Sequence, residues 1–123
     1  MKTRLLSVLV AGLTLLFGAQ AYAQSARQDI VHAYTLLKLS NHDYGGHRVA
    51  AIKALEAAGH ELGLDMKGKG TAGEMQMQSD GQMAEASRIL HGARDRLTTA
   101  DREHAAKHVD KAIEEIDLAL KKK

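Results

Sequence analysis

Apolar side chains recur at spacings of three and four residues in four separate segments of this chain. Such spacing places them on one face of an α-helix. No segment shows the sustained alternation that would indicate a β-strand. The four stripes are Ala26, Ile30, Ala33 and Leu37; Ala51, Leu55, Ala58 and Leu62; Ala86, Leu90, Ala93 and Leu97; and Ala105, Val109, Ala112, Ile116 and Ala119. The pattern predicts an all-α protein.

The breaks between the stripes set the expected helix ranges, which are about 25–39, 46–62, 82–98 and 100–121. The breaks at 40–46 and 98–101 are short and predict tight turns, whereas the glycine-rich segment 63–81 predicts a long loop. We therefore expect an up-down-up-down four-helix bundle built from two similar helical hairpins. In that topology both short turns lie at the same end of the bundle.

The second and fourth predicted helices share the pattern H-x3-A-I-x2-[LI]-x2-A. It comprises His47, Ala51, Ile52, Leu55 and Ala58 in the first copy, and His108, Ala112, Ile113, Ile116 and Ala119 in the second. The shared histidine and the matching hairpin order favour internal duplication. The alternative is that two amphipathic helices simply align at their apolar stripes.

The first 23 residues have the features of a secretory signal peptide. A basic segment, 1–4, precedes the uncharged and mostly apolar segment 5–19, and Ala21-Tyr22-Ala23 fits a cleavage signal. The alternative is a membrane anchor, but the apolar run is short for a span of about 20 residues. We expect cleavage after Ala23, export of residues 24–123 to the periplasm or beyond, and no stable membrane anchor.

Composition narrows the function of the exported part. Removal of residues 1–23 takes away Lys2 and Arg4, so 15 basic side chains balance 15 acidic ones. Nucleic acid binding needs a concentrated positive surface, and only the last three lysines offer one, so no nucleic acid partner is expected. The chain has no cysteine, so its stability must come from packing and no metal is expected to be required for folding.

Histidines gather near the two predicted short turns and are the candidate metal ligands. His104 and His108 are four residues apart on one helix, so they share a face and can bind one ion. His47 starts the second helix, close to His42 and Asp43 in the first turn. Neutral imidazole suits copper, nickel or zinc, and a carboxylate can complete the site. The alternative is a set of solvated histidines at the edges of the apolar stripes.

Other candidate ligands lie outside this group. His32 and His60 point away from their stripes, so we expect them on the surface. Met75 and Met77 form an M-x-M pair in the long loop, where thioethers could bind Cu(I) or could pack over the bundle.

The segments GHRVAAIKALEAA and KHVDKAIEEIDLAL resemble those of small exported helical-bundle bacterial proteins of largely unknown function. More distantly they resemble the small metal-binding protein family, whose hairpins repeat H-x3-A motifs. The resemblance implies binding of copper or other divalent metals in the periplasm, and His47 and His108 match the motif. This chain has only seven histidines, fewer than the His-rich pattern of that family.

Of two further classes of function, the sequence is compatible with a binding module and argues against an enzyme. The bundle could be a non-catalytic binding or structural module that contacts a peptide or another envelope protein. The long loop favours this function, because loops of such length in compact domains are often functional. An enzyme is not expected, because the sequence has neither a nucleophile motif nor a phosphate-binding glycine motif.

Overall fold

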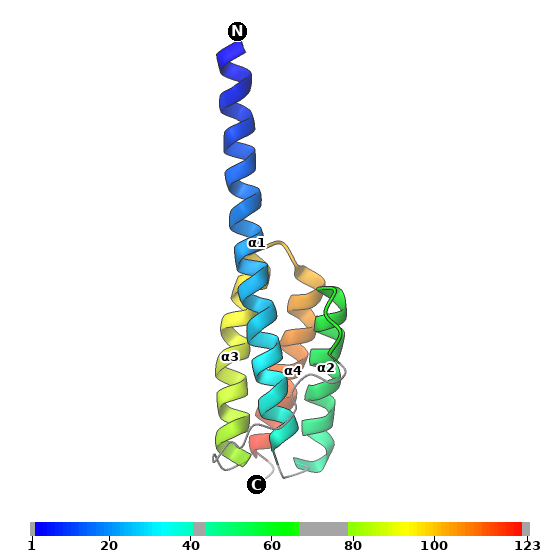
Figure 1. The fold of residues 1–123 in the computed structure, drawn as a ribbon. Helices are drawn as coiled ribbons and strands as arrows, with labels where there is room; N and C mark the ends of the chain where they lie inside the picture. Colours follow the sequence, from blue (N-terminus) through cyan, green and yellow to red (C-terminus); the bar gives the residue numbers. More distant parts are fainter. Residues whose placement is uncertain (1, 41–43, 67–78, 122–123) are drawn as a thin grey trace.

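The computed structural model describes residues 2–40, 44–66 and 79–121, with side chains from Gln20 onward. These ranges form four α-helices and one 3-10 turn, and they contain no strand. The elements are α1 (Lys2–Leu39), η1 (Tyr44–Gly46), α2 (His47–Glu61), α3 (Ser79–Thr99) and α4 (Glu103–Lys121). Figure 1 shows the four helices packed side by side. The prediction of an all-α four-helix bundle is confirmed.

The four predicted apolar stripes form the interior of the bundle. Every residue of these stripes is at most 3% exposed. The two tyrosines of the bundle interior are also buried, and each phenol donates to a carboxylate at the edge of the core. The Tyr34 hydroxyl donates to Glu56 Oε1 at 3.2 Å, and the Tyr44 hydroxyl donates to Asp80 Oδ1 at 2.6 Å. Burial, followed by these carboxylates, raises the pKa of both phenols.

The bonds of Tyr44 also reveal the directions of the helices. Tyr44 lies just before α2, and Asp80 is the second residue of α3, so α2 and α3 begin at the same end of the bundle. We call this the η1 end; it also holds the last residues of α4 (Figure 1). The opposite end holds the end of α2 and the turn between α3 and α4 (Figure 1). Gln24 also lies there, because it lines a hollow with Leu62 and Gly63 directly after α2, and we call this end the Gln24 end.

The third helix therefore runs in the opposite direction from the one expected for an up-down-up-down bundle. Helices α2 and α3 run the same way, so the connection between them joins opposite ends of the bundle. Helix α2 has 15 residues and is about 22 Å long at 1.5 Å per residue. A connection of the length of 62–78 can cover that distance, since an extended chain spans about 3.3 Å per residue. Short loops force neighbouring helices to alternate, but a long loop does not.

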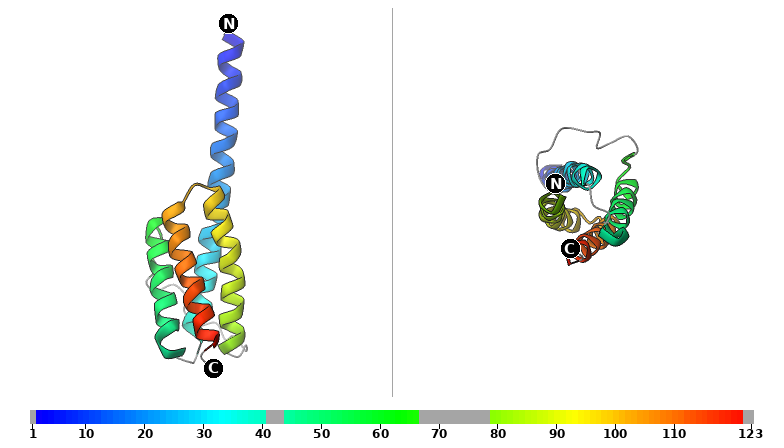
Figure 2. Two further views of the ribbon diagram at one scale, coloured as in Figure 1. Left: turned by 180° about the vertical axis from the view of Figure 1, so that it is seen from behind. Right: turned by 90° about the horizontal axis from the view of Figure 1, so that it is seen from below.

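The equivalent helices of the two predicted hairpins pack against each other. Helix α1 packs most extensively on α3, and α2 packs on α4; α3 and α4 are also close neighbours, while α1 and α2 make the least contact. The end-on view in Figure 2 shows this four-cornered arrangement. Each of these neighbouring pairs is antiparallel.

Packing of α1 into the bundle begins at Ala23. Residues 20–22 are exposed, with Tyr22 49% accessible, whereas Ala23 is only 5% accessible. Before this point α1 projects beyond the other helices (Figure 1). No helix in the described ranges is both long enough and apolar enough to cross a membrane.

Candidate functional site

His47 is the first residue of α2 and is held at the η1 end by a carboxylate. Gly45 and Gly46 precede it with φ of 64° and 87°, values that favour glycine and let the chain reverse before the helix starts. The ring Nδ1 of His47 lies 2.6 Å from Glu115 Oε2 on α4. Lys111 Nζ lies 3.0 Å from the other oxygen of Glu115. These two contacts, first His47 and then Lys111, hold the pKa of Glu115 below its usual value.

His104 and His108 lie on the opposite half of α4. His104 is exposed and lines a hollow of about 160 Å³ together with Glu61, Asp101, Arg102, Glu103 and Ala105. His108 is half-buried one helical turn later. Glu115, which binds His47, is eleven residues beyond His104 and seven beyond His108, or about 16 and 10 Å along the axis at 1.5 Å per residue.

The structure thus brings His104 close to His108 but leaves His47 near the other end of α4. The separation follows from the connection between α2 and α3, which joins opposite ends of the bundle. The turn before α2 therefore lies at the η1 end, and the turn between α3 and α4 lies at the Gln24 end. His42, Asp43, Met75 and Met77 lie outside the described residues. In the portions that are described, no group of three or more His, Asp or Glu side chains is placed to hold a metal ion. As expected, His32 and His60 are exposed.

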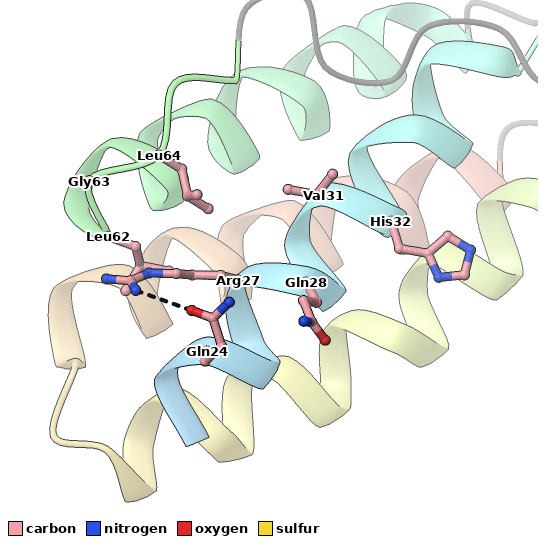
Figure 3. A pocket seen from close by; sticks show the side chains of 8 residues that line it. All are labelled: Gln24, Arg27, Gln28, Val31, His32, Leu62, Gly63 and Leu64. Atoms are coloured by element: carbon pink, nitrogen blue, oxygen red, sulfur yellow. Dashed lines mark hydrogen bonds between the residues drawn. The ribbon is translucent and has the colours of Figure 1, made fainter. Parts of the chain in front are cut away.

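A larger hollow lies at the Gln24 end, between α1 and the segment that follows α2. It has a volume of about 640 Å³, and we call it the α1 hollow. Figure 3 shows its eight lining residues. They are Gln24, Arg27, Gln28, Val31 and His32 of α1, and Leu62, Gly63 and Leu64 after α2.

A Schellman motif at the end of α2 builds the outer wall of the α1 hollow. The Leu64 amide donates to the Gly59 carbonyl at 2.7 Å, and the Gly63 amide donates to the His60 carbonyl at 3.1 Å. Gly63 has φ of 73°, the left-handed conformation that this motif requires. Met66 is buried against Gly59, where an added Cβ would lie 2.7 Å from Met66 Cγ. Together these contacts hold Leu64 over α1.

The α1 hollow combines an apolar side with one permanent positive charge. Leu64 and Val31 point toward the same space (Figure 3). Arg27 lines the hollow together with Leu62, and its Nη1 donates to Gln24 Oε1 at 3.5 Å (Figure 3). The Arg27 Nε atom is buried and has no hydrogen-bond partner among the described residues. None of the eight lining residues is acidic.

Three arginines of the bundle have carboxylate partners, whereas Arg27, like Arg48 and Arg102, has none in the described ranges. Arg96 pairs with Asp29, Arg88 pairs with Glu85, and Arg94 lies near Asp95 and Asp110. Within the described ranges no carboxylate lies within ion-pair distance of Arg27.

Sequence reasoning missed both the α1 hollow and the partner of His47. One signal for the hollow was present, because glycine followed by an apolar residue after a helical stripe is typical of a Schellman motif. Glu115 gave no such signal, since its contact with His47 depends on the direction of α3 and α4.

Comparison with known proteins assigns no relative: this chain matches no protein-family model, no curated protein and no solved structure. The candidate sites are therefore interpreted from their own chemistry.

Proposed function

We propose that this protein is a non-catalytic binding module whose ligand site is the α1 hollow. The observation that carries the proposal is a hollow of about 640 Å³ with an apolar side and a few polar groups. Ligand sites in proteins have volumes of roughly 300–1,000 Å³ and this mixed lining. The polar groups are amides, a guanidinium and an imidazole, and no hydroxyl, thiol or carboxylate accompanies them. That set favours binding over catalysis.

A neutral fluorescent probe such as N-phenyl-1-naphthylamine tests this site, because its fluorescence rises in apolar surroundings. Wild-type protein should bind the probe, and Leu64→Gln should weaken binding at least tenfold because it makes the outer wall polar. Leu118→Gln is the matched control, since Leu118 is an exposed leucine on α4 near the η1 end. No probe binding, or equal binding by both variants, would show that the α1 hollow is not a ligand site.

Divalent metal binding is the second candidate, and we confine it to His104 and His108. The observation in its favour is their spacing of one helical turn on α4, and Glu61 lines the smaller hollow together with His104. Two imidazoles on one helix face can bind Cu(II), Ni(II) or Zn(II). His47 is left out of the pair because Glu115 holds it near the other end of α4.

Calorimetric metal titration tests this second candidate. His104→Ala and His108→Ala should each weaken binding at least tenfold, whereas His32→Ala, His60→Ala and His47→Ala should leave it unchanged. Binding should also weaken as the pH falls through about 6.5, because protons compete for the ring nitrogens. Unchanged affinity in a variant that lacks both His104 and His108 would remove the metal-binding candidate.

We also propose that the protein is exported and cleaved after Ala23. The support is the sequence of residues 1–23, together with the start of packing at Ala23. Mass spectrometry of the mature protein from its native envelope should show a chain that begins at Gln24. A mature chain that retains Met1 would contradict export by cleavage.

A further inference from the structure

We infer that the ligand of the α1 hollow is an amphiphile with one anionic head and an aliphatic tail. The inference rests on the proposed function and specifies the chemical class that the site selects. It follows from two features of the lining, which are the unpaired guanidinium of Arg27 and the apolar wall formed by Val31, Leu62 and Leu64.

The anionic head is indicated by Arg27. An arginine is always charged, and its guanidinium offers five donors that match the two oxygens of a carboxylate. The Arg27 Nη1 group donates one long hydrogen bond to Gln24 Oε1, and the buried Nε has no acceptor among the described residues. Nε is enclosed by the protein, so a ligand oxygen would bind at the Nη donors, and no carboxylate in the described ranges neutralises their charge. The carboxylates of Glu61 and Asp65 are not part of the lining.

The aliphatic tail is indicated by the opposite wall. Leu62 is 3% exposed, and Val31 and Leu64 are partly buried hydrophobic residues packed against the core. The lining holds no Phe, Tyr or Trp, and its one ring is the His32 imidazole, so the wall formed by Val31, Leu62 and Leu64 is aliphatic. Each CH2 group of a hydrocarbon chain that is buried on such a surface strengthens binding about fourfold.

The two features lie close enough for one small molecule to use both. Arg27 and Val31 are one turn apart on α1 and both line the hollow, and Leu64 faces them from the segment after α2 (Figure 3). His32 occupies the far rim, toward α3. A monocarboxylate with a chain of medium length would place its head at Arg27 and its tail against Leu64.

Three ligands with the same chain and different heads test this inference: decanoate, decanol and decyltrimethylammonium. Each is titrated into the full-length protein against the neutral probe. Wild-type protein should bind decanoate at least tenfold more tightly than decanol, and the cationic compound most weakly. Arg27→Gln should reduce decanoate affinity to that of decanol and leave decanol unchanged. Arg102→Gln, a change of an exposed arginine at the same end of the bundle, should have no effect.

The remaining outcomes separate the two proposals. Equal binding of decanoate and decanol by the wild type would overturn the anionic class, while probe binding would still support the site. A loss of all three ligands in Arg27→Gln would also overturn it, since Arg27 would then only shape the wall. Failure of every ligand and of the neutral probe would overturn the α1 hollow as a binding site.

Discussion

The two hairpins of this bundle have similar sequences but differ in how closely their helices pack. Helices α3 and α4 pack closely, and Arg94 reaches Asp110 between them. Helices α1 and α2 make less contact, and the α1 hollow lies beside them, at the end where α2 gives way to the segment 62–64. An apolar stripe fixes which face of a helix is buried, but it does not fix how near each neighbour lies. The candidate ligand site occurs in the looser hairpin.

The first way to test this comparison is to remove a core leucine from each hairpin. Leu55 of α2 and Leu90 of α3 are both fully buried, so Leu55→Ala and Leu90→Ala should each lower the free energy of unfolding by about 2–5 kcal/mol. Urea denaturation followed by circular dichroism measures both. A loss below about half a kcal/mol for Leu55→Ala alone would mean that the looseness of α1 and α2 extends into the core.

A second test concerns the pair that joins the two hairpins, His47 of α2 and Glu115 of α4. Glu115→Gln should lower stability at pH 7 by about 1–2 kcal/mol, because it removes a charged hydrogen-bond acceptor. The control is Glu114→Gln, since Glu114 is exposed and lies 3.8 Å from Lys111. An exposed pair of this kind contributes little.

The contribution of Glu115 to stability should also change with pH in a defined direction. The folded-state pKa of Glu115 lies below the ordinary value of 4.5, so the unfolded chain takes up this proton first as the pH falls. The stabilisation is therefore complete above about pH 4.5 and is lost as the pH falls through the folded-state pKa. The difference between wild type and Glu115→Gln should shrink over that range. A difference that does not change down to the lowest measurable pH would contradict the contact.

A third comparison uses α2 and α3, which both end in a Schellman motif. At α3 the Arg102 amide donates to the Leu97 carbonyl at 2.8 Å, and the Asp101 amide donates to the Thr98 carbonyl at 3.1 Å. Gly63 after α2 and Asp101 after α3 both adopt positive φ, 73° and 60°. Gly63→Ala should cost about 1 kcal/mol, because a Cβ disfavours this conformation and no other atom lies within 4 Å of it. Asp101→Gly should raise stability by a similar amount. Thermal denaturation checks both signs, and a stabilising Gly63→Ala would contradict the assigned backbone.

The smallest expected effect distinguishes the two helical glycines. Gly92→Ala in α3 should raise stability by about 0.5–1 kcal/mol, since alanine favours helix and its Cβ would lie 3.6 Å from Arg96 Nη1. Gly59→Ala in α2 should give less than this gain, or a loss, because Met66 must move. Equal gains at both positions would mean that Met66 is not held against α2.

The sequence predicted the bundle interior well, because spacings of three and four residues specify the buried face of a helix regardless of its neighbours. Leu37, Leu90 and Ile116 were all assigned to the core in this way, and all three are fully buried. The direction of α3 could not be predicted, since a long connection permits either direction at little extra cost in loop entropy.

The separation of His47 from His104 and His108 follows from that one direction. His47 and His108 match in sequence, yet the antiparallel packing of α2 and α4 puts His47 level with Glu115 and away from His108. The α1 hollow could not be predicted from the sequence either, because its size depends on the distance between α1 and α2. The Schellman motif at Gly63 indicates where the chain turns but not how far from α1 it passes.

The antiparallel packing of α1 on α3 and of α2 on α4 has a consequence for assembly. Each half of the chain covers its apolar faces chiefly with the other half, so the molecule resembles a dimer of hairpins joined by a tether. If the tether between residues 66 and 79 were cut, the two fragments would remain associated, and their stability would then depend on protein concentration. A fragment that carried only one hairpin would expose its apolar faces and would pair with a second copy of itself, as in domain swapping.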